Sequence, residues 1–150
     1  MVSKVLVATA QHLQERGQAL WPPEVLTPER LLKHYPQETW RVAWENGQPV
    51  GTFCLLRADP FFWPDDPAGE AFYLHKLGVH PAAQGRGLAQ KLLHFAVQET
   101  REAGRPWLKL DTASDRSKLR ALYNDFGFED VDERQVGAYY VVRMRMEILP

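Results

Sequence analysis

The chain has 150 residues, of which 45% are hydrophobic and 25% charged, and its net charge at pH 7 is −1. This length predicts one domain with a buried core, and the near-neutral charge without a long basic run argues against a nucleic-acid partner. Cys54 is the only cysteine, which excludes an internal disulfide and a cysteine metal cluster. No apolar run reaches membrane-spanning length, and the run at residues 5–8 is too short for a signal peptide, so we expect a cytoplasmic protein without a membrane partner.

The first 36 residues predict a strand followed by two helices. The strand covers residues 5–8, and Thr9 can cap a helix that runs to about residue 20. A second, short helix begins after Thr27, where the threonine cap is followed by a proline at the first helical position, and this helix stops before Pro36.

Three strands and an irregular loop follow. Residues 40–45 and 50–57 predict two strands joined across Asn46-Gly47, which is the strongest hairpin signal in the chain. The segment over residues 58–69 is acidic, aromatic and rich in proline, and it predicts a loop. Residues 71–79 form a largely apolar run and predict the third of these strands.

A glycine-containing loop, Gln84-Gly85-Arg86-Gly87-Leu88-Ala89, connects this strand to a helix. The order strand, loop, helix brings free backbone N–H groups and the positive end of a helix dipole to one point, which favours phosphate binding. The two glycines leave room for a ligand, and Arg86 could add a charge-assisted bond to it. A simple tight turn is the alternative, because the loop fits neither a P-loop nor the G-x-G-x-x-G pattern.

A helix, a strand and a further helix come next. The first helix begins at Gly87 and ends before Gly104, a residue type that suits the left-handed position after a helix. Residues 107–111 predict a buried strand, and either Ser114 or Asp115 caps the next helix. The apolar face of that helix has the spacing i, i+3, i+4, i+7 and consists of Leu119, Leu122, Tyr123 and Phe126.

Two strands close the chain, one beginning at Val131 and one over residues 138–148. In the last strand apolar residues alternate with Arg143, Arg145 and Glu147, which predicts one solvated face. The complete order, β-α-α-β-β-β-α-β-α-β-β, predicts a mixed sheet with helices on both faces.

Two motifs resemble those of the GNAT superfamily of N-acetyltransferases. The first, Gln84-x-x-Gly87-x-Ala89 after Leu77-Gly78-Val79-His80-Pro81, is similar to the acetyl-CoA signature of that family. The second covers residues 119–128, in which a tyrosine lies four residues before Gly-Phe. The motifs occur in the family's order and at its usual separation, and the resemblance covers residues 71–128 well.

The resemblance implies a fold and a cofactor. The fold is α/β (an α+β mixed sheet) of the GNAT-like acyl-CoA N-acyltransferase type, a single N-acetyltransferase domain over residues 1–150, in which strands 71–79 and 107–111 splay apart. The cosubstrate is acetyl-CoA, with no metal. Backbone groups of Leu77 and Val79 would hold the pantetheine arm and help to polarise the thioester carbonyl. The expected cofactor-binding residues are Leu77, Gly78, Val79, Gln84, Gly85, Arg86, Gly87, Leu88, Ala89, Arg116 and Tyr123.

Arg116 stands where many family members carry an asparagine that bonds the pantetheine arm. Arg116, Lys118 and Arg120 could contact the phosphates of CoA, or they could form a solvated helix face. This departure affects only the expected asparagine contact with the pantetheine arm, and the prediction that acetyl-CoA is the cosubstrate is unchanged.

The family's reaction is the direct attack of a primary amine on the thioester through a tetrahedral intermediate, which benefits from a base, oxyanion donors and an acid. Tyr123 is the acid that the second motif implies, although its apolar helix face also fits a core residue. His75 is our first choice for the base, provided that no bulge changes its strand parity with Leu77, and Glu70 is the second. A purely structural role is the alternative for both His75 and Glu70. Asp111 either takes part in this chemistry or caps the turn that follows it.

Three segments that can line the acceptor side, residues 18–28, 58–69 and 130–139, combine acids with aromatic residues. The acids there and at the start of the next strand are Asp59, Asp65, Asp66, Glu70, Asp130, Asp132 and Glu133; the aromatics are Trp21, Phe61, Phe62, Trp63 and Tyr139. This composition favours a cationic amine acceptor, and ordinary surface acids around a solubilising loop are the alternative.

The leading hypothesis is therefore an acetyl-CoA-dependent N-acetyltransferase that acts on a small molecule or peptide. A catalytically silent acyl-CoA-binding or sensor module of the same fold is the second hypothesis. An unrelated nucleotide-binding domain, which uses the glycine loop for a pyrophosphate, is the third. The identity of the acceptor and the oligomeric state, a homodimer included, are left open.

Overall fold

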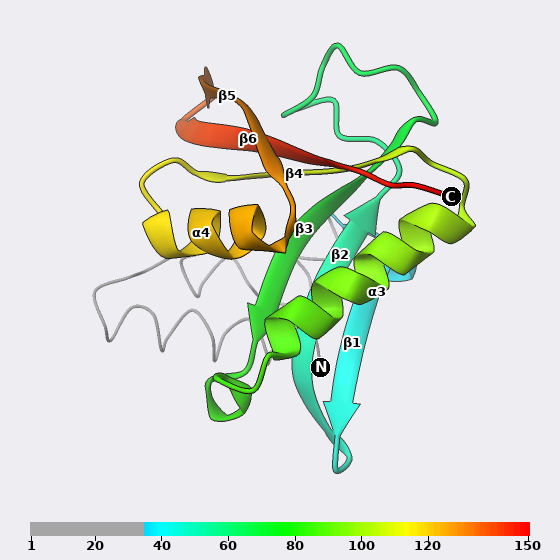
Figure 1. The fold of residues 1–150 in the computed structure, drawn as a ribbon, viewed down its shortest axis with the longest axis vertical. Helices are drawn as coiled ribbons and strands as arrows, with labels where there is room; N and C mark the ends of the chain where they lie inside the picture. Colours follow the sequence, from blue (N-terminus) through cyan, green and yellow to red (C-terminus); the bar gives the residue numbers. More distant parts are fainter. Residues whose placement is uncertain (1–34) are drawn as a thin grey trace. The chain divides into compact units, whose positions relative to one another are not determined.

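The structure of the protein, a computed structural model, describes residues 35–150. The strand predicted at residues 5–8 and the two helices predicted before residue 36 lie outside the described residues. The chain divides into two compact units, the first comprising Met1–Leu55 and Lys76–His94 and the second Leu56–His75 and Phe95–Pro150. Within residues 35–150, six strands occur in the sheet order β1-β2-β3-β4-β6-β5, and Figure 1 labels each of them. β3 contributes to both units. No helix within residues 35–150 has the length and apolar character needed to span a bilayer.

The first unit contains the predicted hairpin. β1 (Trp40–Glu45) pairs antiparallel with β2 (Gln48–Leu56), after the short helix η2 (Gln37–Thr39). Asn46 and Gly47 both have positive φ, +52° and +74°, which is the geometry of the two-residue turn that Asn-Gly favours. The hairpin is confirmed, and β2 begins two residues earlier than predicted because this turn needs only two residues.

The start of α3 (Leu88–Glu102) packs against β2 where Gly51 has no side chain. A Cβ on Gly51 would lie 2.9 Å from Leu92 Cδ1, closer than real Cβ atoms approach their neighbours. Leu92 and Leu93 are buried in this contact region. The helix ends as predicted, since Gly104 follows it with φ +70°.

The parallel pair at the centre of the sheet is short. β3 (Ala71–Val79) pairs with β4 (Trp107–Ala113) from Ala71↔Trp107 to Leu74↔Leu110. Both strands continue beyond this ladder, in agreement with the splay that the family resemblance implies.

A left-handed residue interrupts β3 directly after the ladder. Lys76 has φ +54°, which breaks the alternation of side chains as a bulge does. We expected His75 and Leu77 to point to the same side of the strand, provided that no bulge lay between them. Lys76 breaks the alternation between these two residues, so that expectation does not hold.

In the second unit β4 also pairs antiparallel with β6 (Tyr139–Glu147), which pairs with β5 (Glu129–Val136). The prediction of one solvated face on β6 is wrong at its centre, where Arg143 is only 9% exposed. The loop before β3 covers that face. Arg143 Nη1 donates to the Phe62 carbonyl, and its guanidinium carbon lies 4.4 Å from the centroid of the Trp63 ring.

The helix α4 (Ser117–Phe126) begins later than predicted, and the residue before it is Arg116 rather than Ser114 or Asp115. Ser114 N still donates to the Tyr140 carbonyl at 3.3 Å. Its backbone therefore continues the pairing of β4 with β6, so this residue cannot serve as a helix cap.

Candidate active site

The glycine loop lies in the first unit between β3 and α3. The short helix η3 (Pro81–Ala83) follows β3, and Gln84 Nε2 donates to the Val79 carbonyl at 3.1 Å, which secures the turn. Gly85 and Gly87 have φ of +81° and +72°. Both positions therefore lie in the left-handed region, where glycine is the residue without a steric penalty.

The space above both glycines is open. Among the described residues, a Cβ on Gly85 would meet no atom within 4 Å, and one on Gly87 would meet only Gln90 Oε1 at 4.0 Å. Leu88 and Ala89 begin α3, and the first N–H groups of a helix have no partner within it. The loop therefore presents backbone donors and a helix dipole to open space, which is an arrangement suited to phosphate.

Arg86 has a protein partner in this structure. Its Nη1 donates to Glu45 Oε1 of β1 at 2.7 Å, and both side chains are about half exposed. Ion pairs this exposed contribute little to stability. A phosphate could therefore take the place of the Glu45 carboxylate.

The end of β3 in the first unit is packed against β2. His80 N donates to the Val50 carbonyl at 2.7 Å, and Gly78 and Val79 are buried. Leu77 is partly buried. The segment expected to hold pantetheine is thus packed against β2, directly before the glycine loop.

Tyr123 lies in the second unit, on the buried face of α4, and is 7% exposed. Its carbonyl accepts from both Gly127 N and Phe128 N, and the Phe128 ring folds back to 5.8 Å from the tyrosine ring. Burial, and then the negative charge of Asp111, raises the pKa of the Tyr123 hydroxyl above its ordinary value. The hydroxyl is therefore held in the protonated form that an acid catalyst requires.

His75, the first candidate for the base, forms a buried pair with Asp59. His75 Nε2 lies 2.8 Å from Asp59 Oδ2, and the two side chains are 12% and 7% exposed. Sequence reasoning missed this role of Asp59, because nothing in the acidic loop distinguishes Asp59 from the acids beside it. Asp59 and His75 are 16 residues apart in the sequence, and they meet only because the loop folds back on β3.

Asp111 lies in the same cluster. One nitrogen of His75 and one carboxylate oxygen each of Asp59 and Asp111 all lie within 4.8 Å of one another. The second unit thus brings the candidate base His75 together with two carboxylates.

Two other predicted residues lie outside this cluster. Glu70 is exposed at the start of β3, where its carbonyl accepts from Trp107 N. Arg116 is partly buried at the cap position of α4 and makes no side-chain capping bond. Arg120, which could have met a phosphate, instead pairs with Asp130 and Glu133.

Most of the acids expected around the acceptor are engaged in ion pairs of the second unit. Asp66 pairs with Lys109 at 2.8 Å. Asp132 pairs with Arg143 and Arg134 at 2.8 Å, and the bond from Arg143, followed by that from Arg134, lowers the pKa of this carboxyl to about 2. Asp59, Asp130 and Glu133 are also paired. Most of the acids in these segments therefore bind basic side chains of the protein itself.

Trp21 lies outside the described residues, and the other aromatic residues of these segments differ in exposure. Trp63 is buried against Tyr73, so it belongs to the core. Phe61 and Tyr139 are more than half exposed, and Phe62 lies between them, with its ring centroid 4.8 Å from Phe61 and 6.2 Å from Tyr139. The same Phe62 centroid is 6.2 Å from the His75 ring.

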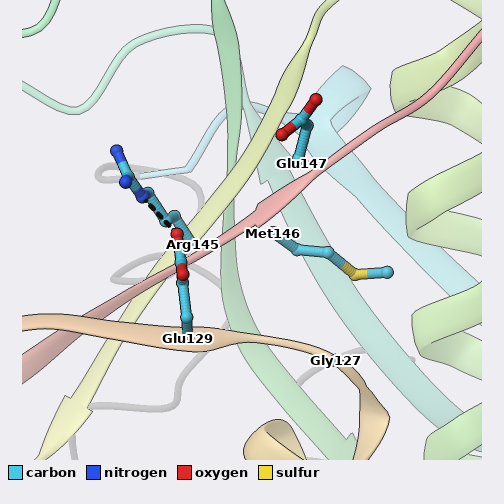
Figure 2. Close-up of a pocket in the computed structure, with 5 residues that line it drawn as sticks. All are labelled: Gly127, Glu129, Arg145, Met146 and Glu147. Atoms are coloured by element: carbon cyan, nitrogen blue, oxygen red, sulfur yellow. Dashed lines mark hydrogen bonds and ion pairs between the residues drawn. The ribbon is translucent and has the colours of Figure 1, made fainter.

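A separate pocket of about 260 Å³ opens in the second unit, lined by Gly127, Glu129, Arg145, Met146 and Glu147. Figure 2 shows Arg145 bound to Glu129 and Met146 extending to the other side of β6. None of the predicted site residues lines this pocket. This pocket therefore does not coincide with the predicted site.

Residues 6–128 match the family described as the acetyltransferase (GNAT) family. The chain is 30% identical over 122 residues to an acetyltransferase of Yersinia pestis (strain Pestoides F), which covers 81% of this chain and 79% of that protein. A GNAT-family acetyltransferase from Listeria monocytogenes has a TM-score of 0.78 at 19% identity, covering 97% of this chain and 87% of that one. An acetyltransferase of Salmonella typhimurium, solved with acetyl-CoA, has a TM-score of 0.66 at 21% identity, covering 99% and 87%. The chain therefore belongs to the acetyltransferase (GNAT) family, and the protein is an acyltransferase.

Proposed function

We propose that the protein is an N-acetyltransferase that transfers the acetyl group of acetyl-CoA to a primary amine of a small molecule or peptide. The observation that carries this proposal is the glycine loop, with Gly85 and Gly87 at positive φ beneath open space at the start of α3, in a member of this family. Relatives of the same fold, such as the Salmonella protein, bind acetyl-CoA. A lone buried thiol, Cys54, fits a reducing compartment, so we place the protein in the cytoplasm.

The first unit would hold the cofactor. The backbone N–H groups from Gly85 to Ala89 would bind the phosphates, since Gln84 N already donates to the Pro81 carbonyl, and Arg86 would exchange Glu45 for one of them. Backbone groups of Leu77 and Val79 would bind the pantetheine arm. The N–H of Val79 is then a candidate donor to the oxyanion of the tetrahedral intermediate.

The second unit would supply the proton transfers. A protonated amine cannot attack, and a lysine-like amine has a pKa of about 10.4, so a base beside it lowers the barrier. His75 would take the amine proton as the nitrogen attacks the acetyl carbon. When the carbon–sulfur bond breaks, the thiolate would take the hydroxyl proton of Tyr123.

The acceptor is proposed to be a cationic amine that carries an apolar or aromatic group. Asp65 and Glu70 are the exposed acids of the set that take no part in the ion pairs described above. Phe61 and Tyr139 offer exposed ring faces close to Phe62, which neighbours His75. Aromatic faces attract cations by about 0.5–2 kcal/mol. We expect the aromatic rings to contribute more to acceptor binding than the carboxylates, because the remaining acids are already paired with basic side chains of the protein.

A panel of cationic, neutral and anionic amines, with release of the CoA thiol as the readout, tests the proposal. We expect thiol release with cationic amines that bear an apolar group, and stabilisation by acetyl-CoA but not by NAD or ATP in thermal melting. Stabilisation by acetyl-CoA without thiol release from any amine would instead indicate a silent acyl-CoA-binding module. Preference for acceptors with a free carboxylate and no extra positive charge, insensitive to salt, would contradict the cationic acceptor.

A further inference from the structure

We infer that His80 is a positioning residue for the proposed acetyl-CoA site, because its imidazole ring holds the turn that leads from β3 into the glycine loop. The ring does so by accepting a backbone hydrogen bond, which only an unprotonated ring nitrogen can accept. The affinity for acetyl-CoA is therefore coupled to the protonation of this histidine. The ligand is that of the proposed function, on which this inference rests, and the residues concerned belong to the first unit.

The turn is the short helix η3 (Pro81–Ala83), and His80 caps its start. Nδ1 of His80 accepts from Ala82 N at 3.1 Å. Ala82 is the second residue of this helix, and the side chain of a capping residue typically accepts from the second or third N–H. Asparagine and serine are among the usual residues at such a position, and neither of them titrates. The histidine therefore makes this cap sensitive to protonation.

Every backbone N–H group of the turn has a partner within the turn. Pro81 has no N–H, and the N–H groups of Ala83 and Gln84 donate to backbone carbonyls at the start of the turn, at 2.8 and 3.3 Å. The remaining N–H, on Ala82, is the one that a side chain accepts. The donors that would bind phosphate begin directly after this turn, at Gly85. The geometry of the turn thus sets the direction of those donors.

The turn is also tied to the two strands that precede it. His80 N donates to the Val50 carbonyl of β2 at 2.7 Å, and Gln84 Nε2 donates to the Val79 carbonyl at 3.1 Å. Ala83, between these two anchors, is buried. Loss of the cap leaves both anchors in place, so we expect the glycine loop to change its position locally while the fold is kept.

Protonation of His80 reverses the role of Nδ1. An imidazolium carries a hydrogen on both ring nitrogens, so Nδ1 would then face the Ala82 N–H as a second donor. Two donors cannot form a hydrogen bond with each other, and the turn loses its cap. His80 is only partly buried, so solvent can deliver the proton. Histidine is the side chain that ordinarily changes its charge between about pH 5 and about pH 8.

His80 forms no ion pair within residues 35–150. The other titratable side chains on the strands, glycine loop and α3 in the described part of this unit are those of Arg41, Glu45, Cys54, Lys76, Arg86, Lys91 and His94. Glu45 and Arg86 bind each other, and the Lys76 ammonium lies 5.9 Å from the centroid of the Tyr35 ring. The protonation of His80 itself is therefore the event that we expect to change the cap.

The alternative role for a protonated His80 is that of a cation that binds the phosphates of CoA. That role predicts tighter binding as pH falls, whereas loss of the cap predicts weaker binding. The 3.1 Å bond favours the cap, because it engages Nδ1 with the turn. The two roles differ in the sign of their effect, so a matched pair of proteins distinguishes them.

The primary experiment compares the wild-type protein with His80→Asn in calorimetric titrations of acetyl-CoA at about pH 8 and about pH 5. Asparagine caps a helix well and does not titrate. Phosphate monoesters change charge near pH 6, but this change affects both proteins alike and cancels in the ratio of their Kd values. We expect equal Kd values at the higher pH. At the lower pH the wild-type Kd should be roughly fivefold higher than that of His80→Asn, the size of a capping contribution.

Two outcomes of this comparison would overturn the inference. One is a ratio of the two Kd values that stays the same at both pH values, since the protonation of His80 would then have no effect on the loop. The other is tighter binding by the wild-type protein at the lower pH, which would make His80 a phosphate-binding cation.

Two further variants separate positioning from a general effect on the protein. His80→Ala removes the acceptor at every pH, so its Kd should exceed that of the wild-type protein by roughly fivefold at about pH 8 and equal it at about pH 5. His94→Asn removes an exposed histidine of α3 and should keep the wild-type pH dependence. A lower melting temperature of His80→Ala with an unchanged Kd at both pH values would show that the cap is only structural. If His80→Ala does not fold, the comparison with His80→Asn still decides.

NMR of the full-length protein with ¹⁵N-labelled histidine tests the cap without a ligand. His80→Asn identifies the His80 signals by their loss. We expect the neutral ring to carry its proton on Nε2, because Nδ1 accepts from a backbone donor. A neutral ring with its proton on Nδ1 would contradict the cap. If acetyl-CoA binds to neither protein at either pH, the proposed cofactor site fails and the positioning role fails with it, while the tautomer still shows whether His80 caps the turn.

Discussion

Arg86 of the glycine loop donates a 2.7 Å hydrogen bond to Glu45, the last residue of β1. The pair places a carboxylate beside the backbone donors that would receive phosphate. A negative charge there opposes an anionic ligand, and it also occupies the one arginine of the loop. If CoA binds at this loop as proposed, Glu45 should weaken that binding.

Removal of that charge should tighten binding. For Glu45→Gln we expect the Kd of acetyl-CoA to fall by about two- to fivefold, the size of an exposed ion-pair effect. Isothermal titration calorimetry at low and high salt measures it, and the gain should shrink as salt screens the charges. Glu129→Gln, which breaks the exposed pair with Arg145, should leave Kd unchanged. A weaker Kd for Glu45→Gln would mean that Arg86 needs Glu45 for its position.

Gly87→Asp should abolish binding of acetyl-CoA, because its carboxylate would enter the open space above the loop and repel the pyrophosphate. Any side chain at this position is strained at φ +72°. Gly87→Ala is therefore the control, since it carries the same strain without the charge. Thermal melting with and without acetyl-CoA compares the two variants. Equal stabilisation of Gly87→Asp and the wild-type protein would show that phosphate binds elsewhere.

Tyr123→Phe keeps the ring that packs on Phe128 and removes only the hydroxyl. General acid catalysis is worth roughly 10²–10⁴-fold, so we expect kcat to fall by at least tens of fold with the Kd of acetyl-CoA little changed. Steady-state thiol release measures this, and Tyr140→Phe, which alters an exposed tyrosine, is the control. Unchanged turnover in Tyr123→Phe would return this tyrosine to a purely structural role.

The Asp132 carboxyl should make stability depend on acidic pH. Hydrogen bonds from Arg143 and then Arg134 lower its pKa from 3.8 to about 2. A group with a lowered pKa in the folded state contributes stability above its unfolded pKa, and that contribution is lost as pH falls from about 4 to about 2. Urea unfolding at several pH values should show a flatter acid limb for Asp132→Asn than for the wild-type protein. Parallel limbs would mean that the Arg143 pair contributes no pH dependence.

Local chemistry was sufficient for the hairpin turn and for the end of α3, although not for the start of α4. Asn46-Gly47 adopts two left-handed residues because a tight hairpin turn requires them, and Gly104 follows α3 for a related reason. The glycine loop before α3 is likewise visible in the sequence. Each of these signals depends on residues a few positions apart, so no knowledge of distant packing is needed to read it.

Only the tertiary structure decided the partners of the charged residues. Asp59 meets His75 across 16 positions, and Arg143 is buried because the Phe62 carbonyl and the Trp63 ring, about 80 positions earlier, cover it. The alternation of charged and apolar residues in β6 predicts only that two faces differ, not what lies over each face. The sequence by itself determined where the chain turns and which motif lies in its loop. Which acids belong to ion pairs and which to the candidate site was decided by packing between distant segments, because a charge can be buried only where another segment supplies its partner.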